Sequence, residues 1–159
     1  MHRWITSAAL AAASLSAFAQ GPAEVPYPAG YRSWMHVKSM TINPGHPLHE
    51  AFGGIHHLYA NPKAIAGYKN GKFADGSVIV FDLLEAKAAD NAVTEGARKV
   101  VGVMHRDAKR YAATGGWGYE GFKGDTRERA VTQAKAPEAC HGCHTQVKDR
   151  GFVFSALRP

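Results

Sequence analysis

The sequence predicts an α+β domain in which an antiparallel sheet of about five strands is accompanied by short helices and a C-terminal helix. Three observations indicate this fold. Five segments have the alternating or wholly apolar pattern of strands, and the helix signals between them are short. The 17 glycines and 8 prolines leave no room for the four long helices of a bundle. Short strands interrupted by small helices are typical of the α+β class.

The first 30 residues are expected to precede the folded domain. Residues 1–19 combine a short basic start, an apolar stretch and Ala17-Phe18-Ala19, which is the pattern of a secretory signal peptide and its cleavage site. The apolar stretch is shorter than the about 20 residues that span a bilayer, so no membrane anchor is expected after cleavage. Residues 20–30 contain three prolines and two glycines and are predicted to form an N-terminal arm. The domain then covers residues 31–159, in the periplasm.

The first half of this domain is expected to contain two strands and one helix. Residues 31–42 and 55–59 have strand patterns, and a loop rich in turn residues separates them. Asn61-Pro62 is typical of a helix N-cap followed by proline at the first helical position. The helix is predicted to cover residues 62–68 and to end near Asn70-Gly71.

The second half is expected to complete the sheet and to end in a helix. Residues 77–84 give the strongest strand signal, and because both faces are largely apolar, this strand is predicted to be central. Residues 86–96 are polar and alanine-rich and are predicted to be a surface connection. The remaining expected elements are strands over residues 99–104 and 117–122, a helical turn from Asp107 to Tyr111, a loop over 124–137, a helix over 139–147 and a closing strand over 152–154.

The most informative motif is Cys140-His141-Gly142-Cys143-His144, in the predicted C-terminal helix. C-x-x-C-H is the spacing at which two thiols and one imidazole attach a haem covalently. One helical turn brings both sulfurs to the two vinyl groups of the porphyrin, and the adjacent histidine binds the iron axially. The motif therefore predicts one haem c, with Cys140 and Cys143 as its thioether residues and His144 as the axial ligand of its iron.

Two cysteines at this spacing also occur in redox dithiols, disulfides and zinc sites. A zinc site of the usual kind needs further soft ligands, and the sequence has no second C-x-x-C. A thioredoxin-like dithiol needs a β-α-β context, which is not expected here. Haem attachment is the preferred interpretation, and a dithiol or disulfide is the main alternative. No methionine follows His144, so the downstream methionine ligand of ordinary small electron-transfer cytochromes is not expected.

The charge of the chain indicates little about its partners. Without residues 1–19 there are 18 lysines and arginines against 13 acidic residues, a net charge of +5. No basic run interleaves with aromatic residues, so nucleic-acid binding is not expected. An acidic redox partner protein is compatible with this mild basic balance.

Short motifs are spread along the whole domain in a fixed order. They are Tyr31-Arg32-x-Trp34, Tyr59-Ala60-Asn61-Pro62, Asp75-Gly76-Ser77-Val78-Ile79-Val80, Met104 with Arg110-Tyr111, and Gly116-Trp117-Gly118-Tyr119. Together with the C-x-x-C-H motif, they resemble the cytochrome P-460 and cytochrome c′-beta superfamily from about Tyr31 to Pro159. The resemblance implies a β-rich fold, commonly a homodimer, with five-coordinate haem c and an open distal side.

Two functions divide that superfamily. Cytochromes P-460 oxidise hydroxylamine and carry a covalent bond between a lysine and the porphyrin, whereas cytochromes c′-beta lack this bond and bind diatomic gases beneath a cap of phenylalanines. The resemblance places the lysine at the position of Phe81, and phenylalanine cannot form the bond. Lys87 shares the strand parity of Phe81 but lies about 20 Å further along an extended strand, and Lys72 has the wrong parity. The resemblance places the second distal phenylalanine at Phe52.

Gas binding is therefore the preferred function, and catalysis is not expected. From the residues alone, Phe52 and Phe81 are ordinary core aromatics; with the resemblance, both rings are expected to face the vacant iron position. Phenyl rings supply no hydrogen-bond donor, which dioxygen needs more than nitric oxide or carbon monoxide do. The expected ligands are nitric oxide and carbon monoxide, and the protein is expected to carry, sense or scavenge nitric oxide.

Two alternatives remain open at this point. A hydroxylamine-oxidising enzyme needs a proton acceptor above the haem, for which Glu50, Glu120 and Glu138 are the candidates, although each also fits a solvated surface carboxylate. A plain electron-transfer cytochrome needs a second axial ligand, for which His56 and His57 are the candidates.

Overall fold

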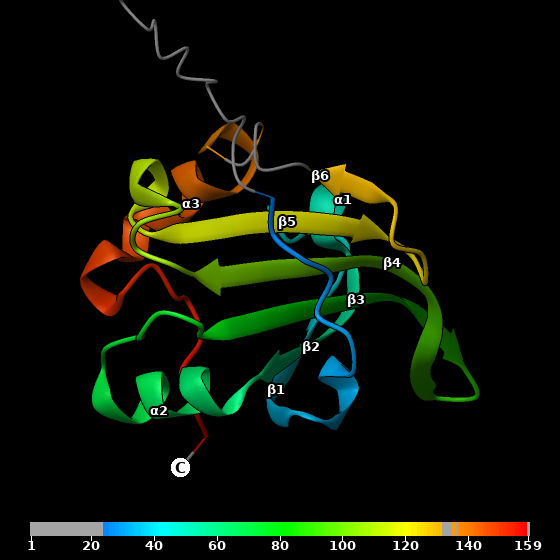
Figure 1. Cartoon of the computed structure of the whole chain (residues 1–159). Helices are drawn as coiled ribbons and strands as arrows, with labels where there is room; N and C mark the ends of the chain where they lie inside the picture. The colour runs from blue at the N-terminus through cyan, green and yellow to red at the C-terminus, as the bar shows by residue number, and fades with distance from the viewer. Residues whose placement is uncertain (1–23, 132–134, 136, 159) are drawn as a thin grey trace, which may run out of the picture.

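The computed structural model describes residues 24–131, 135 and 137–158, and its centre is a six-stranded antiparallel sheet (Figure 1). The strands lie across the sheet in chain order, β1-β2-β3-β4-β5-β6. The predicted α+β class is confirmed, with six strands where about five were expected. The predicted signal peptide, residues 1–19, lies outside the described residues. None of the helices that the structure describes is long and apolar enough to cross a membrane.

Each strand pairs with the next along the chain. The bounds are Met35–Ile42 (β1), Gly54–Ala60 (β2), Val78–Ala89 (β3), Ala92–Arg106 (β4), Trp117–Lys123 (β5) and Arg129–Val131 (β6). β3 lies between β2 and β4 and is buried on both faces in its first half, as its apolar pattern predicts. The predicted strands over residues 55–59, 99–104 and 117–122 are confirmed within β2, β4 and β5.

The helices are short and connect or flank the strands. The α-helices are His49–Phe52 (α1), Pro62–Asn70 (α2) and Gly142–His144 (α3), a π-helical turn covers Pro137–His141 (η3), and 3-10 turns cover Tyr31–Ser33 (η1), Ala112–Thr114 (η2) and Thr145–Arg150 (η4). The predicted cap of α2 is confirmed, because Asn61 Oδ1 accepts a hydrogen bond from the backbone N–H of Ala64 at 2.9 Å. α2 ends where Gly71 takes a left-handed conformation, with φ of 71°.

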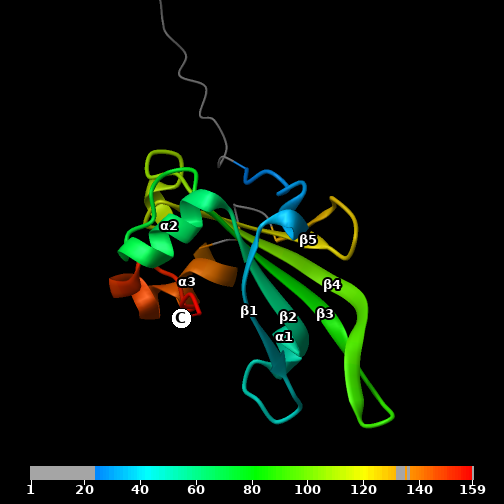
Figure 2. The same cartoon turned by 90° about the horizontal axis from the view of Figure 1, so that it is seen from below.

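The two faces of the sheet are covered by different parts of the chain. On one face, here called the C-terminal face, α2 and the segment after β6 pack against Ile79, Trp117 and Tyr119. On the opposite, N-terminal face, the segment before β1 packs against Val80 and Val103. Figure 2 shows α2 and α3 together on one side of the sheet, and Figure 1 shows the N-terminal segment in blue crossing in front of it. Because side chains alternate along a strand, each residue's position assigns it to one of these faces.

A buried acidic residue ties the N-terminal segment to the sheet. Asp82 is 2% exposed, accepts a hydrogen bond from the Tyr31 hydroxyl at 2.8 Å and receives the Nε–H of Arg98 at 2.5 Å. Burial, together with the Asp82 carboxylate, raises the pKa of the Tyr31 hydroxyl, so this tyrosine remains a donor. The last part of the predicted arm, which the structure describes from Glu24, is therefore packed onto the sheet, and Val25 is fully buried.

The prediction of a surface connection over residues 86–96 is wrong. β3 continues to Ala89 and β4 begins at Ala92, so these residues form a β-hairpin arm that projects beyond the other strands (Figures 1 and 2). Asp90 and Asn91 have φ of 51° and 57°, the left-handed values of a tight hairpin turn. The arm is exposed on both sides, so it lacks the one-sided apolar pattern by which strands are predicted.

Four further expectations about elements need correction. Residues 31–33 form a 3-10 turn, so the first strand begins at Met35. The predicted helix over residues 139–147 is divided among η3, α3 and η4. Residues 152–154 join no strand of the sheet: Phe152 lies in a turn with φ of 66°, and the next two residues have no ladder partner among the described residues. The predicted loop over 124–137 contains the short strand β6.

Candidate functional site

The C-x-x-C-H motif lies on the C-terminal face, where η3 and α3 meet. Cys140 is the last residue but one of the π-helical turn and packs, partly buried, against the cluster that contains Ile79 and Tyr119. Cys143 is exposed in α3, and both cysteines are free thiols. π-helical turns are rare and are frequent at functional sites. The motif thus presents one sulfur toward the core and one toward solvent.

His144 is oriented by a hydrogen bond through one of its ring nitrogens. Its Nδ1 lies 2.7 Å from the carbonyl oxygen of Phe152, so Nδ1–H donates and Nε2 carries the free lone pair. The ring also lies 5.2 Å from the ring of Tyr119 and 5.0 Å from that of Phe154. Burial lowers the pKa of His144, which keeps the imidazole neutral. A neutral imidazole held through Nδ1 is the arrangement in which histidines bind metals through Nε2.

The surroundings of Cys140 do not favour a redox dithiol. Burial, with contributions from Glu120 and Cys143, raises the pKa of the Cys140 thiol to about 11. Reactive cysteines of C-x-x-C oxidoreductases instead have lowered pKa values, because the thiolate is the nucleophile. Across the described parts of the chain, no three His, Cys, Asp or Glu side chains are placed to hold a metal ion.

The two phenylalanines that the sequence selects do contact each other. Phe81 lies on β3, on the C-terminal face, and Phe52 is the last residue of α1. Their ring centroids are 5.8 Å apart with an interplanar angle of 81°, an edge-to-face contact. Phe52 remains 38% exposed. Residues 29 positions apart in sequence thus form one aromatic pair on the face that carries the C-x-x-C-H motif.

Two paired glycines leave a place without side chains of its own beside Phe81, here called the gap. Gly102 of β4 pairs with Phe81 on one side and with Gly121 of β5 on the other, so two glycines lie next to each other on the C-terminal face. A Cβ on either glycine would meet no atom of the described residues closer than 3.4 Å, and neither glycine has a positive φ. Neither backbone conformation nor crowding among described residues therefore requires glycine. Glycine inside a strand is otherwise unfavourable and often marks either a bulge, such as the register shift between Gly121 and Phe122, or a place where another group approaches the backbone closely.

The position of this gap relates it to the histidine of the motif. Tyr119, whose ring contacts His144, precedes Gly121 by two residues on β5 and therefore lies on the same face. The gap thus lies directly beside Phe81. It is two residues along β5 from Tyr119, the residue whose ring contacts His144. The two glycines thus present no side chain of their own to a group bound by His144 on this face.

A family model matches residues 28–155, and its description is cytochrome P460. The chain belongs to the cytochrome P460 family. Members of this family are haem cytochromes, so the chain is a haem protein and its bound metal is iron. No curated protein matches the chain. The residues of this cytochrome fit a haem, because they combine a neutral His144 that is held through Nδ1, two free thiols in the same motif, and two glycines on the face that carries the motif.

The other residues that the sequence suggests for this cytochrome are divided between the two faces. Glu120 is buried on the N-terminal face and pairs with Arg129, so it does not face the motif side of the sheet. Glu50 and Glu138 are exposed. His57 also lies on the N-terminal face, whereas His56 lies on the C-terminal face beside Phe81.

Sequence reasoning did not select several residues that shape the site. These are Tyr119, the Phe152 carbonyl and the paired Gly102 and Gly121. The sequence suggests His56 only together with His57, as a candidate iron ligand. Strand alternation could have placed Tyr119 and Gly121 on one face, because they are two residues apart. The sequence does not show which carbonyl meets His144 or which glycines pair across the strands, because both depend on how the chain segments are aligned in the fold.

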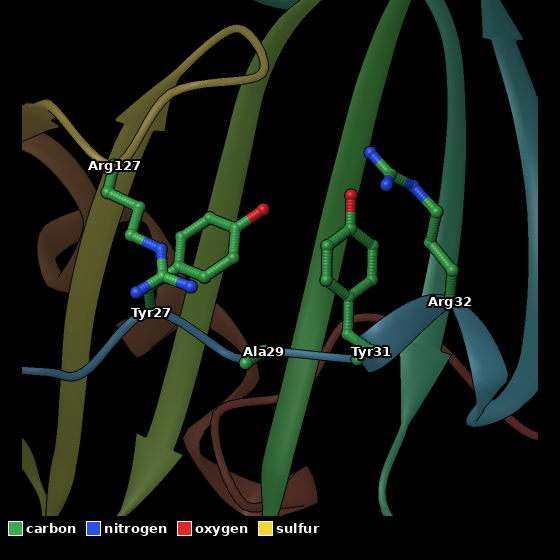
Figure 3. A pocket seen from close by; sticks show the side chains of 6 residues that line it. Tyr27, Ala29, Tyr31, Arg32 and Arg127 are labelled. Carbon is green, nitrogen blue, oxygen red and sulfur yellow. The ribbon is translucent and has the colours of Figure 1, made fainter.

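An open pocket also lies on the N-terminal side of the cytochrome, away from the motif. It is lined by Tyr27, Ala29, Gly30, Tyr31, Arg32 and Arg127. Figure 3 shows the arginine side chains next to the two tyrosine rings, with Arg127 5.4 Å from the ring of Tyr27 and Arg32 5.1 Å from that of Tyr31. These tyrosines pack with the cluster of the N-terminal face, so the pocket is not part of the candidate haem site.

Proposed function

We propose that this protein is an exported cytochrome of c′-beta type that carries one covalently attached haem c and binds nitric oxide and carbon monoxide. Cys140 and Cys143 are the residues for the two thioether bonds, and His144 is the axial ligand of the iron. In this proposal the protein carries, senses or scavenges nitric oxide in the periplasm, as a homodimer.

The contact between Phe81 and Phe52 is the observation that carries this proposal. The resemblance places the crosslinking lysine of cytochrome P-460 enzymes at the position of Phe81, and here a second phenylalanine packs edge-on against it. Lys87 does not replace the lysine, because it lies on the hairpin arm, paired with Thr94 and with its side chain beside Gly96. Lys38 shares the face of Phe81 but lies on β1, two strands away.

The chain's own residues then have distinct roles. Haem iron, once bound, supplies the position at which a gas molecule can bind. The Phe152 carbonyl holds the ring of His144 in one tautomer and orientation, which presents Nε2 to the iron. Phe52 and Phe81 cover the opposite side, exclude water and larger anions, and restrict access by small ligands.

The optical spectrum of the purified, reduced protein tests the choice between gas binding and hydroxylamine oxidation. A chain without a lysine crosslink should give an ordinary haem c spectrum after denaturation. A strongly red-shifted Soret band that persists in denaturant would indicate a crosslink and would contradict the proposal. Mass spectrometry after acid extraction tests the attachment: the intact chain should retain the mass of one haem, and a Cys140→Ser, Cys143→Ser double variant should lose it.

Export and assembly are tested separately. Expressed in a bacterium that attaches haem c, the mature protein should be recovered from the periplasm with its N-terminus at Gln20. Sedimentation of this material should give twice the mass of one chain. A cytoplasmic product or a monomer at all concentrations would contradict that part of the proposal.

A further inference from the structure

Two histidines that are adjacent in the sequence point to opposite faces of the sheet. The ring of His57 lies on the N-terminal face, 2.6 Å from Ser39 Oγ through Nδ1 and 2.6 Å from Glu95 Oε1 through Nε2. His56 lies on the C-terminal face, opposite Met40 of β1 and Leu83 of β3. Both ring nitrogens of His57 therefore have partners on the N-terminal face. His56 is the member of the pair that lies on the face of the candidate haem site.

One ring nitrogen of His56 is a buried polar atom without a hydrogen-bond partner among the described residues. The residue is 6% exposed, and its Nδ1 has no hydrogen-bond partner among the described residues. An unpaired polar atom costs free energy when buried, so such groups are uncommon in native proteins and often have a functional reason. Burial and the neighbouring His57 lower the pKa of His56, which keeps the ring neutral. A neutral imidazole still has one N–H to donate.

His56 also belongs to the aromatic cluster on the proposed ligand side. Its ring centroid is 4.5 Å from that of Phe81, with an interplanar angle of 36°, and Phe81 in turn contacts Phe52. Gly102, which leaves the gap on the adjacent strand, pairs with Phe81. A hydrogen-bond donor thus lies within the cluster that the sequence predicts to be wholly apolar.

We propose that His56 is the hydrogen-bond donor of the ligand chamber, which is the proposed ligand position beside Phe52 and Phe81. With this donor, the chamber accepts dioxygen as well as nitric oxide and carbon monoxide. The inference rests on the proposed function, because it needs an open iron position on the side of Phe52 and Phe81. Dioxygen acquires negative charge when it binds ferrous haem, and an imidazole N–H stabilises that charge where phenyl rings do not. The polarity of the chamber, and not only its size, then selects the ligand.

The test compares three variants of the haem-loaded protein, His56→Leu, His56→Gln and His105→Leu. His105 is the matched control: its Nδ1 is also buried and unpaired, but its ring lies on the N-terminal face, 6.1 Å from that of Tyr111. The readouts are the infrared stretching frequency of bound carbon monoxide and the rate at which dioxygen leaves the ferrous protein. A donor near the ligand lowers the carbon monoxide frequency, and a merely structural residue does not.

His56→Leu should raise the stretching frequency and speed dioxygen release about tenfold, the factor expected for one hydrogen bond of ordinary strength. His56→Gln, which keeps an N–H donor, should stay near the wild type, and His105→Leu should change neither readout. If His56→Leu fails to fold, His56→Phe keeps a ring against Phe81 and removes the donor.

Other outcomes would contradict either the role of His56, the open iron position or the proposed function as a whole. If the wild type binds carbon monoxide but His56→Leu or His56→Phe changes neither readout, His56 is not the donor and the proposed function stands. If the wild-type ferrous iron is six-coordinate and these variants make it five-coordinate, His56 is an iron ligand and the open chamber is disproved. If the wild type binds no carbon monoxide and removing His56 does not change this, the proposed function itself fails.

Discussion

Phe81 shows how much the chemistry of a single residue depends on the face to which its strand turns it. Its neighbours Val80 and Asp82 point to the N-terminal face and pack with the N-terminal segment, whereas Phe81 meets Phe52 and His56 on the C-terminal face. The sequence predicts Phe52 and Phe81 through the resemblance. It does not predict which of His56 and His57 lies on the C-terminal face. Both faces of this sheet are covered, so the alternation of side chains alone does not distinguish them.

Replacing Phe81 by alanine should speed the association of carbon monoxide with the reduced, haem-loaded protein. The phenyl ring restricts access to the proposed ligand position, and its removal leaves only the Phe52 ring of the pair. Flash photolysis measures the rate, and we expect an increase of at least about tenfold, corresponding to about 1.4 kcal/mol of lost steric hindrance.

Val80→Ala is the matched control for this variant. Val80 is fully buried beside Phe81 but points to the N-terminal face. Its truncation should lower the free energy of unfolding and leave the association rate unchanged. Equal rates in wild type and Phe81→Ala would mean that the ring does not cover the iron.

The sequence predicts those strands and helices that bury apolar side chains or carry a capping residue. The cap at Asn61 and the strands β2, β4 and β5 are predicted in place, since burial and local hydrogen bonding leave a pattern in the sequence. The hairpin arm of β3 and β4 leaves none, because both of its sides are exposed. The helix over 139–147 is predicted as one piece, whereas the structure divides it after His141 and after His144, into η3, α3 and η4.

The Asn61 side chain joins α2 to β3, so its removal should cost more than an ordinary cap. Its Oδ1 accepts hydrogen bonds from the N–H groups of Ala64 at 2.9 Å and Val78 at 3.1 Å, and its Nδ2 donates to the Gly76 carbonyl at 2.9 Å. Asn61→Ala should lower the free energy of unfolding by about 2 kcal/mol in urea denaturation. Asn70→Ala, at the exposed end of the same helix, should change it by less than about 0.5 kcal/mol; equal losses would contradict this role.

At the scale of the whole molecule, the two ends of the described chain close the two faces of one sheet. The N-terminal segment covers one face through Tyr31 and Asp82, and the C-terminal segment carries the C-x-x-C-H motif to the other. Several histidines become buried or partly buried in this arrangement, and their pKa values are lowered chiefly by the loss of solvent. They are His36, His56, His105, His141 and His144.

These lowered pKa values predict that the folded protein loses stability as the pH falls. Below the ordinary histidine value of 6.5, the unfolded chain binds protons that the folded chain does not, so the free energy of unfolding decreases through and below that pH. Urea denaturation of the haem-loaded protein at pH values of about 7.5 and 5.5 measures the change. His56→Leu combined with His105→Leu should reduce it, and equal or greater stability at the lower pH would contradict the prediction.

The coordination of the reduced iron, followed by optical and resonance Raman spectroscopy during titration with carbon monoxide and nitric oxide, tests the central claim most directly. With His144 as the axial ligand and Phe52 and Phe81 on the opposite side, the ferrous protein should be five-coordinate and high-spin and should bind both gases. A six-coordinate, low-spin ferrous protein that leaves carbon monoxide unbound would show that a side chain of the protein fills the proposed ligand position.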